Sequence, residues 1–294
     1  MFPSFLPSQV KDLQELTSIR LAQNIQRIPI STSFYPKAIQ TAYVHLGVSQ
    51  TPLLLLHGFD SSLLEFCRII PYLSNQYETG LIDLLGFGFT QRFPEINYNS
   101  ESLKNHLYQS WKTLINRPVI LVGASMGGAT AIDFALTYPE IVKKLILIDS
   151  VGYSGSFPIG KLLIPPVDSM ATEFWRQRKL QALNFAPFLN INTSQIEAIK
   201  FTSLHLEMPY WQEAMISFMI SGGYEDLTPR ISQVKQPTLI LWGEKDETLG
   251  TVDAYRFHQN IVNSQLVWMK KCGHVPHLEQ PELTANAILE FIDL

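Results

Sequence analysis

The stretch VILVGASMGGATAI, residues 119–132, is the most informative part of this 294-residue chain. It begins as an apolar run with strand character and ends in a run with helical character, and Gly123-Ala124-Ser125-Met126-Gly127 joins them in the pattern G-x-S-x-G. Such a turn is tight and strained, and it lifts the serine hydroxyl above the sheet. We therefore predict that Ser125 is a nucleophile. The alternative is a packing turn in which Ser125 only caps a helix.

A serine hydroxyl is a poor nucleophile unless a base activates it, and the base needs an acid to orient it. With this turn, the expected order along the chain is serine, acid, histidine. Asp246 follows the apolar run LILWG, and His274 follows the last strand-like run, so we predict that they are the acid and the base. Glu244 and His277 are their rivals. The two histidines lack further ligands at metal-site spacing, so we predict no metal.

Acyl transfer also needs hydrogen-bond donors for the oxyanion that develops on the substrate. One predicted donor is the backbone N–H of Met126, directly after the nucleophile. The other is the backbone N–H of Phe59, in the loop that follows the strand-like run PLLLLHG. His57 in that run is interpreted as a structural hydrogen-bonding residue.

The order of strand-like and helix-like runs predicts the architecture. They alternate along residues 28–149 and again along 235–294, which indicates an α/β core with a mostly parallel sheet covered on both faces. Residues 150–234 are mostly helical in pattern, and we expect a lid over the carboxyl edge of the sheet. Residues 1–27 form an extension, and apolar residues at every third position of 8–28 predict an amphipathic helix there. That helix either packs on the body of the protein or contacts a membrane.

One helical face of the predicted lid is strongly apolar. It consists of Trp211, Met215, Phe218 and Met219. Phe174 and Phe188 add further apolar bulk elsewhere in the lid. Packing onto the sheet explains many of these residues, but we expect part of the face to line an apolar substrate pocket.

Composition excludes several classes of protein. Hydrophobic residues make up 46% of the chain and charged residues 16%, and the net charge of −4 provides no basic surface for nucleic acid. Two cysteines are too few for a disulfide framework, so we expect a reducing compartment. The sequence contains no long continuous apolar run and no pattern typical of a secretory signal. We therefore predict neither a transmembrane helix nor a signal peptide.

Five motifs together resemble the α/β-hydrolase superfamily. They are LLLLHGFDSS, IDLLGFGFT, VGASMGG, LILWGEKD and GHVPHLEQPE, in that order. Within the superfamily, HGFDSSLLEF, IDLLGFGF and PYWQEAMISFMISGGY look like chlorophyll dephytylases. This resemblance implies hydrolysis of the phytyl ester of chlorophyll to chlorophyllide and phytol, with no cofactor. It also implies peripheral contact with the cytoplasmic side of a photosynthetic (thylakoid) membrane.

Three alternatives remain open at this stage. The protein could be a carboxylesterase or lipase for other apolar esters, a ligand receptor with little turnover, or a lyase on the same fold. Comparing the activity on chlorophyll with the activity on short esters would distinguish a chlorophyll dephytylase from another esterase or lipase. Tight binding without turnover would indicate a receptor.

Overall fold

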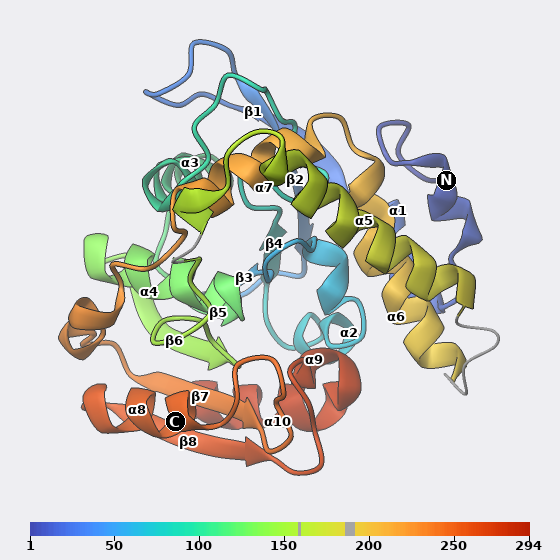
Figure 1. The fold of residues 1–294 in the computed structure, drawn as a ribbon. Helices are drawn as coiled ribbons and strands as arrows, with labels where there is room; N and C mark the ends of the chain where they lie inside the picture. The colour runs from blue at the N-terminus through green and yellow to red at the C-terminus, as the bar shows by residue number, and fades with distance from the viewer. Residues whose placement is uncertain (158–159, 186–191) are drawn as a thin grey trace.

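The computed structural model describes every residue except 158–159 and 186–191. At its centre lies an eight-stranded sheet in the order β1-β2-β4-β3-β5-β6-β7-β8 (Figure 1). The strands are β1 (Gln26–Ile30), β2 (Ile39–Leu46), β3 (Leu53–Leu56), β4 (Thr79–Ile82), β5 (Val119–Ala124), β6 (Val142–Ile148), β7 (Thr238–Gly243) and β8 (Ser264–Met269). The β1–β2 and β2–β4 pairs are antiparallel, and the other pairs are parallel. The predicted mostly parallel sheet is confirmed.

Two hydrophobic cores lie on opposite faces of this sheet because successive side chains of a strand point to opposite sides. In β3, Leu54 and Leu56 belong to one core, whereas Leu53 and Leu55 belong to the other. The first core also contains residues of α3 (Ser100–Leu114), α4 (Met126–Thr137) and α8 (Val252–Asn260). The second contains residues of α1 (Leu16–Gln23), α2 (Ile70–Leu73), α9 (Pro276–Glu279) and α10 (Pro281–Asp293). Burial on both faces explains why the central strands are continuously apolar.

The N-terminal extension differs from the single helix expected over residues 8–28. A 3-10 helix at Ser8–Asp12 is followed by α1, and β1 already begins at Gln26, two residues before the expected start of the core. The helix is interrupted because the carboxylate of Glu197 accepts hydrogen bonds from the backbone amides of Gln14 and Glu15. Buried apolar side chains of this segment are Leu6, Val10, Leu13, Leu21, Ala22 and Ile25. Of the two interpretations left open, these contacts favour packing on the body of the protein.

Residues 61–73 have a helical pattern in the sequence that predicts one helix, and this prediction is also wrong. The structure has a 3-10 helix at Leu63–Phe66 and a separate short helix, α2. Pro71 lies in the first turn of α2, where a proline is tolerated, but it would break the interior of a longer helix.

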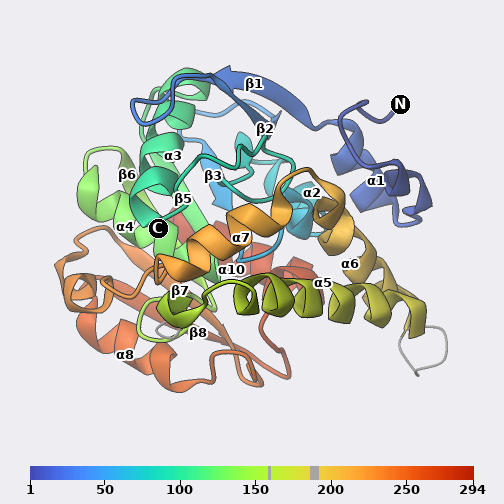
Figure 2. The ribbon, with the colours of Figure 1, turned by 45° about the horizontal axis from the view of Figure 1, so that its top comes forward.

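The segment between β6 and β7 carries the lid helices. They are α5 (Val167–Phe185), α6 (Thr193–Ser203) and α7 (Trp211–Ile220). Figure 2 shows α5 and α7 running side by side on one side of the molecule. Phe218 of α7 packs against Phe59 and Phe87, which follow the carboxyl ends of β3 and β4. The lid therefore covers the edge of the sheet at which Ser125 lies. None of the helices in the described part of the chain combines the length and the apolar composition needed to cross a membrane.

Candidate active site

Ser125 lies at the junction of β5 and α4, in the tight turn that the motif predicts. Its backbone has φ 51° and ψ −117°, a region that residues other than glycine rarely adopt. The turn needs glycines because a Cβ on Gly123 would lie 2.3 Å from the carbonyl oxygen of Gly127. A Cβ on Gly127 would lie 2.1 Å from the carbonyl oxygen of Leu56. Close packing against β3 thus holds the strained serine in place.

Three predicted residues from distant parts of the chain form one line of hydrogen bonds. His274 Nε2 lies 3.1 Å from Ser125 Oγ, and His274 Nδ1 lies 2.9 Å from Asp246 Oδ2. The second oxygen, Oδ1 of Asp246, accepts hydrogen bonds from the amides of Thr248 and Leu249. Burial alone would raise the pKa of Asp246, but the hydrogen bonds from His274 and these amides outweigh it and keep that pKa below its ordinary value. The carboxyl group is thus ionised at neutral pH.

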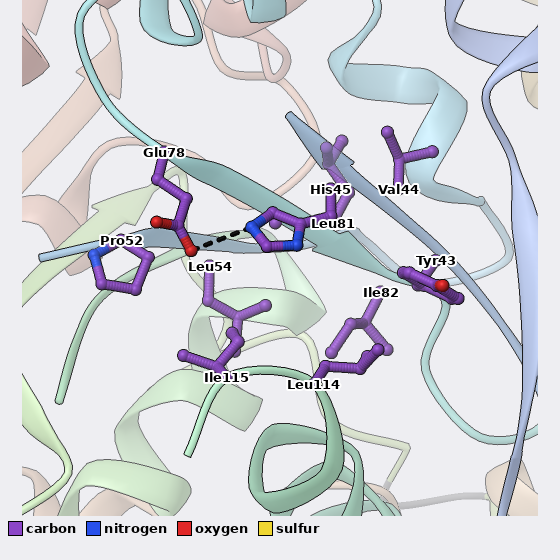
Figure 3. Close-up of a pocket in the computed structure, with 11 residues that line it drawn as sticks. Tyr43, Val44, His45, Pro52, Leu54, Glu78, Leu81, Ile82, Leu114 and Ile115 are labelled. Carbon is purple, nitrogen blue, oxygen red and sulfur yellow. Dashed lines mark hydrogen bonds and ion pairs between the residues drawn. The ribbon is translucent and has the colours of Figure 1, made fainter. Parts of the chain in front are cut away.

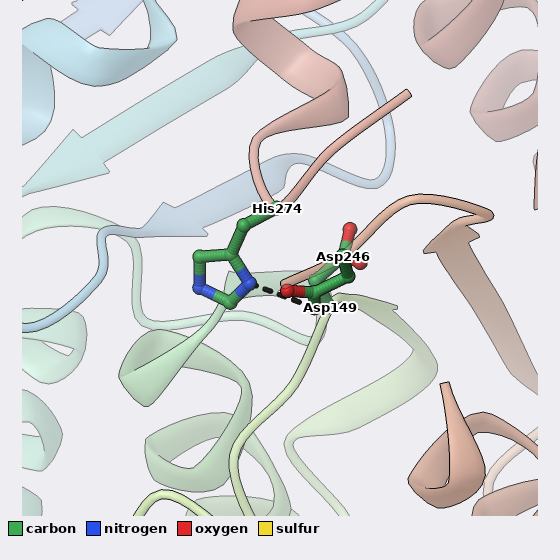
Figure 4. Close-up of side chains that lie close together, drawn as sticks. All are labelled: Asp149, Asp246 and His274. Carbon is green, nitrogen blue, oxygen red and sulfur yellow. Dashed lines mark hydrogen bonds and ion pairs between the residues drawn. The ribbon is translucent and has the colours of Figure 1, made fainter. Parts of the chain in front are cut away.

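A second carboxyl group, that of Asp149, lies beside this line (Figure 4). Asp149, Asp246 and His274 each place one potential metal-ligand atom within 4.8 Å of the other two. Among the described residues, this is the only group of three His, Cys, Asp or Glu residues that lie this close together. Asp149 Oδ1 accepts a hydrogen bond from the amide of Gly243. Burial, together with the nearby charge of Asp246, raises the pKa of Asp149 to about 9. Because His274 and Asp246 are hydrogen-bonded to each other, we interpret the group as a hydrogen-bonding cluster and not as a metal site.

The rival residues lie elsewhere. Glu244 is exposed and accepts a hydrogen bond from the amide of Lys271. His277 is buried, with its Nε2 3.5 Å from a carboxylate oxygen of Glu65. Among the interactions found in the described part of the chain, neither one contacts Ser125 or His274. Geometry therefore favours Asp246 and His274 over their rivals.

Both chain segments that carry the predicted amide donors lie close to Ser125. Met126 is the first residue of α4, where backbone N–H groups have no partner within the helix. In the other segment, a Cβ built on Gly58 would lie 3.4 Å from Ser125 Cβ, so the chain passes close to the nucleophile just before Phe59. His57 is buried and bonds to the backbone, with Nδ1 2.8 Å from Gly58 O and Nε2 accepting from the amide of Leu84. It holds the loop in place, as predicted.

Two glutamates that sequence reasoning missed hold the active-site loops. Glu279 accepts hydrogen bonds from the amides of Gly273 and Val275, on both sides of His274. Glu65 accepts one from the amide of Gly58. Glu65 lies seven residues after the glycine that it contacts, and Glu279 six residues after Gly273, so no local pattern marks either residue.

An apolar cavity of about 150 Å³ lies between the Phe59 loop and the lid. Its lining residues are Phe59, Phe157, Leu163, Ala171, Thr172, Trp175, Trp211, Met215 and Met219. Three of the four residues predicted to bind substrate thus line it. The fourth, Phe218, does not: its ring packs in an aromatic cluster with Phe59, Phe87 and Phe157. That ring is 1% exposed, so it belongs to the core beneath the cavity. Phe188 lies outside the described residues.

Comparison with known proteins assigns the family. The sequence profile of the alpha/beta hydrolase fold family matches residues 51–190. The alpha/beta hydrolase domain-containing protein VTE7 of Arabidopsis thaliana is 34% identical, and the alignment covers 99% of this chain and 90% of the relative. The chain belongs to the α/β-hydrolase fold family. This confirms the resemblance seen in the sequence.

Other matches to this α/β hydrolase include a lipase and an esterase. Lipase 1 of Psychrobacter immobilis is 29% identical, over 91% of this chain and 85% of the relative. The solved structure of a thermophilic esterase from Thermogutta terrifontis superposes with a TM-score of 0.75 at 26% identity, covering 91% of this chain and 98% of the other. Together these relatives support an ester hydrolase.

Proposed function

We propose that this protein is a serine ester hydrolase that cleaves the phytyl ester of chlorophyll. The observation that carries the proposal is the hydrogen-bonded line Ser125–His274–Asp246. The apolar cavity is lined by Phe59, which follows directly after the point at which Gly58 passes close to Ser125. The likeness of three sequence stretches to chlorophyll dephytylases supports the choice of substrate. Carboxylesterase or lipase activity on other apolar esters is the second candidate, and the names of several relatives favour it.

In the proposed mechanism, Ser125 Oγ attacks the ester carbonyl carbon while His274 Nε2 accepts the hydroxyl proton. Asp246 orients the ring and stabilises its cation. The carbonyl oxygen becomes an oxyanion that accepts hydrogen bonds from the amides of Met126 and Phe59. As the intermediate collapses, His274 returns the proton to the alcohol oxygen, phytol leaves and the acyl group stays on Ser125. His274 Nε2 then takes a proton from water, and the resulting hydroxide attacks the acyl carbonyl carbon. The bond from that carbon to Ser125 Oγ breaks, Oγ takes the proton back from His274, and the acid chlorophyllide is released.

The cavity suits an apolar alcohol chain, although about 150 Å³ is smaller than most ligand pockets. A second hollow of about 350 Å³ lies between α5 and α6 and shares Trp175 with the first. We propose that the phytyl chain starts in the cavity and continues past Trp175 into this second hollow. Each buried methylene would add about 0.8 kcal/mol to binding.

Peripheral membrane contact is part of the same proposal, because chlorophyll is a membrane pigment. Large apolar side chains are exposed at the beginning of the lid. They are Leu162, Ile164, Val167, Met170 and Phe174. An apolar surface of this kind suits the interfacial region of a bilayer. We propose that this surface, which we call the α5 surface, rests on the photosynthetic membrane.

The test is incubation with chlorophyll a, followed by chromatography of the products. The parent protein is expected to release chlorophyllide and phytol, and Ser125→Ala to lose about 10⁴-fold or more of that activity. A short acyl ester is assayed in parallel. Cleavage of the short ester without cleavage of chlorophyll would favour the second candidate, and near-normal turnover by Ser125→Ala would exclude the mechanism.

A further inference from the structure

Asp60 is a buried carboxylate in the core whose side-chain partners come from the lid. It directly follows Phe59, has a positive φ of 49°, and is 2% exposed. Its oxygens contact four side chains of the lid. Trp175 Nε1 donates to Oδ2 at 2.8 Å, Trp211 Nε1 donates to Oδ1 at 2.9 Å, His205 Nε2 lies 2.9 Å from Oδ1, and Lys179 Nζ lies 2.6 Å from Oδ2.

These contacts keep the carboxylate ionised. Burial would raise the pKa of Asp60, but the ammonium of Lys179 and the hydrogen bond from His205 outweigh burial and hold that pKa far below its ordinary value. Lys179 also donates to the backbone carbonyl oxygen of Asp60 at 2.7 Å. A buried charge is costly to leave unpaired, so these contacts favour the lid position in which all of them form.

The same contacts position the walls of the apolar cavity. Trp175 and Trp211, both tied to Asp60, line that cavity together with Phe59, the residue next to Asp60 in the chain. The two indoles come from different helices, α5 and α7. The separation between these walls thus depends on one side chain, which also belongs to the loop that carries the proposed Phe59 amide donor.

We infer that Asp60 is a positioning residue that joins the lid to the Phe59 loop and shapes the cavity for the long alcohol chain of the ester. The inference rests on the proposed hydrolase function. It assigns substrate-length selectivity to a carboxylate that takes no part in bond making or breaking.

The first test uses Asp60→Asn, which keeps the side-chain shape but removes the negative charge and one acceptor oxygen. We expect kcat/KM for the phytyl ester to fall by about 10–200-fold relative to kcat/KM for a short ester, mostly through KM. The matched control is Glu78→Gln. Glu78 is also buried and forms an ion pair with Arg117, and Figure 3 shows it bonded to His45. It directly precedes β4, whereas Ser125 follows the carboxyl end of β5. Glu78→Gln is expected to lower stability and leave the ratio unchanged.

A second, milder variant tests the same link if Asp60→Asn does not fold. Trp175→Phe removes the indole N–H but keeps an aromatic ring in the cavity wall. It is expected to shift the same ratio in the same direction, whereas Trp268→Phe, on β8, is expected to leave it unchanged. In the double variant with Asp60→Asn, the effects are expected to be less than multiplicative, because both changes break one link.

A binding measurement distinguishes this inference from the proposed catalysis. Each variant is combined with Ser125→Ala, and its affinity for free phytol is measured by tryptophan fluorescence. Weaker phytol binding with Asp60→Asn or Trp175→Phe, but not with Glu78→Gln or Trp268→Phe, supports the inference whether or not the parent turns over an ester. An unchanged length ratio and unchanged phytol affinity in folded Trp175→Phe, or an equal change in the controls, overturns it.

Discussion

At the scale of single residues, Asp149 and Asp246 are two carboxyl groups beside one histidine, and their surroundings separate their charges. Asp246 receives hydrogen bonds from His274 and two backbone amides, and its pKa is lowered. Asp149 receives one from Gly243, and burial raises its pKa to about 9. At neutral pH the pair therefore carries one negative charge, on the carboxyl group that faces His274.

This difference in charge predicts that replacement by asparagine has very different effects on activity at the two positions. Asp149→Asn resembles the neutral acid already present, so activity on a short ester is expected to stay within about tenfold of the parent. Asp246→Asn is expected to lose about 10⁴-fold, because the amide stabilises the wrong tautomer of His274. Steady-state kcat/KM measures both, with exposed Glu244→Gln as a control near the parent value. Equal losses at 149 and 246 would contradict the assignment.

The sequence places Phe218 and Met219 on one apolar face, but the structure gives them different surroundings. Phe218 is buried in the aromatic cluster, so Phe218→Ala is expected to lower the free energy of unfolding by about 3–5 kcal/mol. Met219 lines the cavity and is half-buried, so Met219→Asp is expected to penalise the phytyl ester selectively, by about 10–200-fold relative to a short ester. Denaturant unfolding and kcat/KM ratios separate the two. A selective loss at Phe218 with unchanged stability would reverse the roles.

At the scale of elements, α5 has two different sides. Trp175 and Lys179 reach Asp60 in the core, whereas Met170 and Phe174 are 67% and 72% exposed. An amphipathic helix within a compact fold normally keeps its apolar face inward. The outward apolar side chains are therefore the feature on which the proposed membrane contact depends.

Phe174→Glu is accordingly expected to weaken sedimentation with liposomes made of thylakoid lipids several-fold. Hydrolysis of a water-soluble short ester should stay unchanged, because Phe174 has no place in the catalytic line. Val262→Glu, at a position 88% exposed before β8, is the control and should bind as the parent does. If both variants sediment like the parent, the α5 surface does not contact the bilayer.

At the scale of the whole molecule, buried histidines make the fold sensitive to acid. Burial lowers the pKa of His106 to about 3, and its Nε2 lies 2.7 Å from Thr41 Oγ1. The unfolded chain binds a proton at this histidine below about pH 6.5, but the folded chain does not bind one until about pH 3. Protonation therefore favours unfolding in this window, and stability falls as the pH falls. His205 acts in the same sense, and Asp149 in the opposite sense.

A difference measurement isolates His106 from these other groups. Compared with His106→Gln, the parent is expected to lose about 1.4 kcal/mol more in unfolding free energy per pH unit between pH 6 and 4. Urea unfolding at several pH values measures this, with His258→Gln on the surface as the control. Parallel pH profiles of the parent and His106→Gln would show that His106 is not the acid-sensitive group.

Local sequence was sufficient for the sheet and for the turn at Ser125. The alternation of strand-like and helix-like runs and the need for glycine beside a strained serine can be seen in short stretches of sequence, so Val119–Ala124 and Met126–Thr137 appear in the structure almost as predicted. The order of the motifs also predicted that Asp246 and His274 lie at the same edge of the sheet as Ser125, since parallel strands end on the same side. Periodicity was less reliable at residues 8–28, because a carboxylate 182 residues away takes two of the backbone amides.

Only the tertiary structure decided which apolar side chain faces the cavity and which carboxyl group joins the lid to the core. Phe218 and Met219 differ by one position on the same helix, and their neighbours from other segments determine their roles. Asp60 obtains its partners from residues more than 100 positions later in the chain. The sequence by itself determined the chemistry available at Ser125. Folding determined the shape around it, because burial and pairing arise only when distant segments pack together.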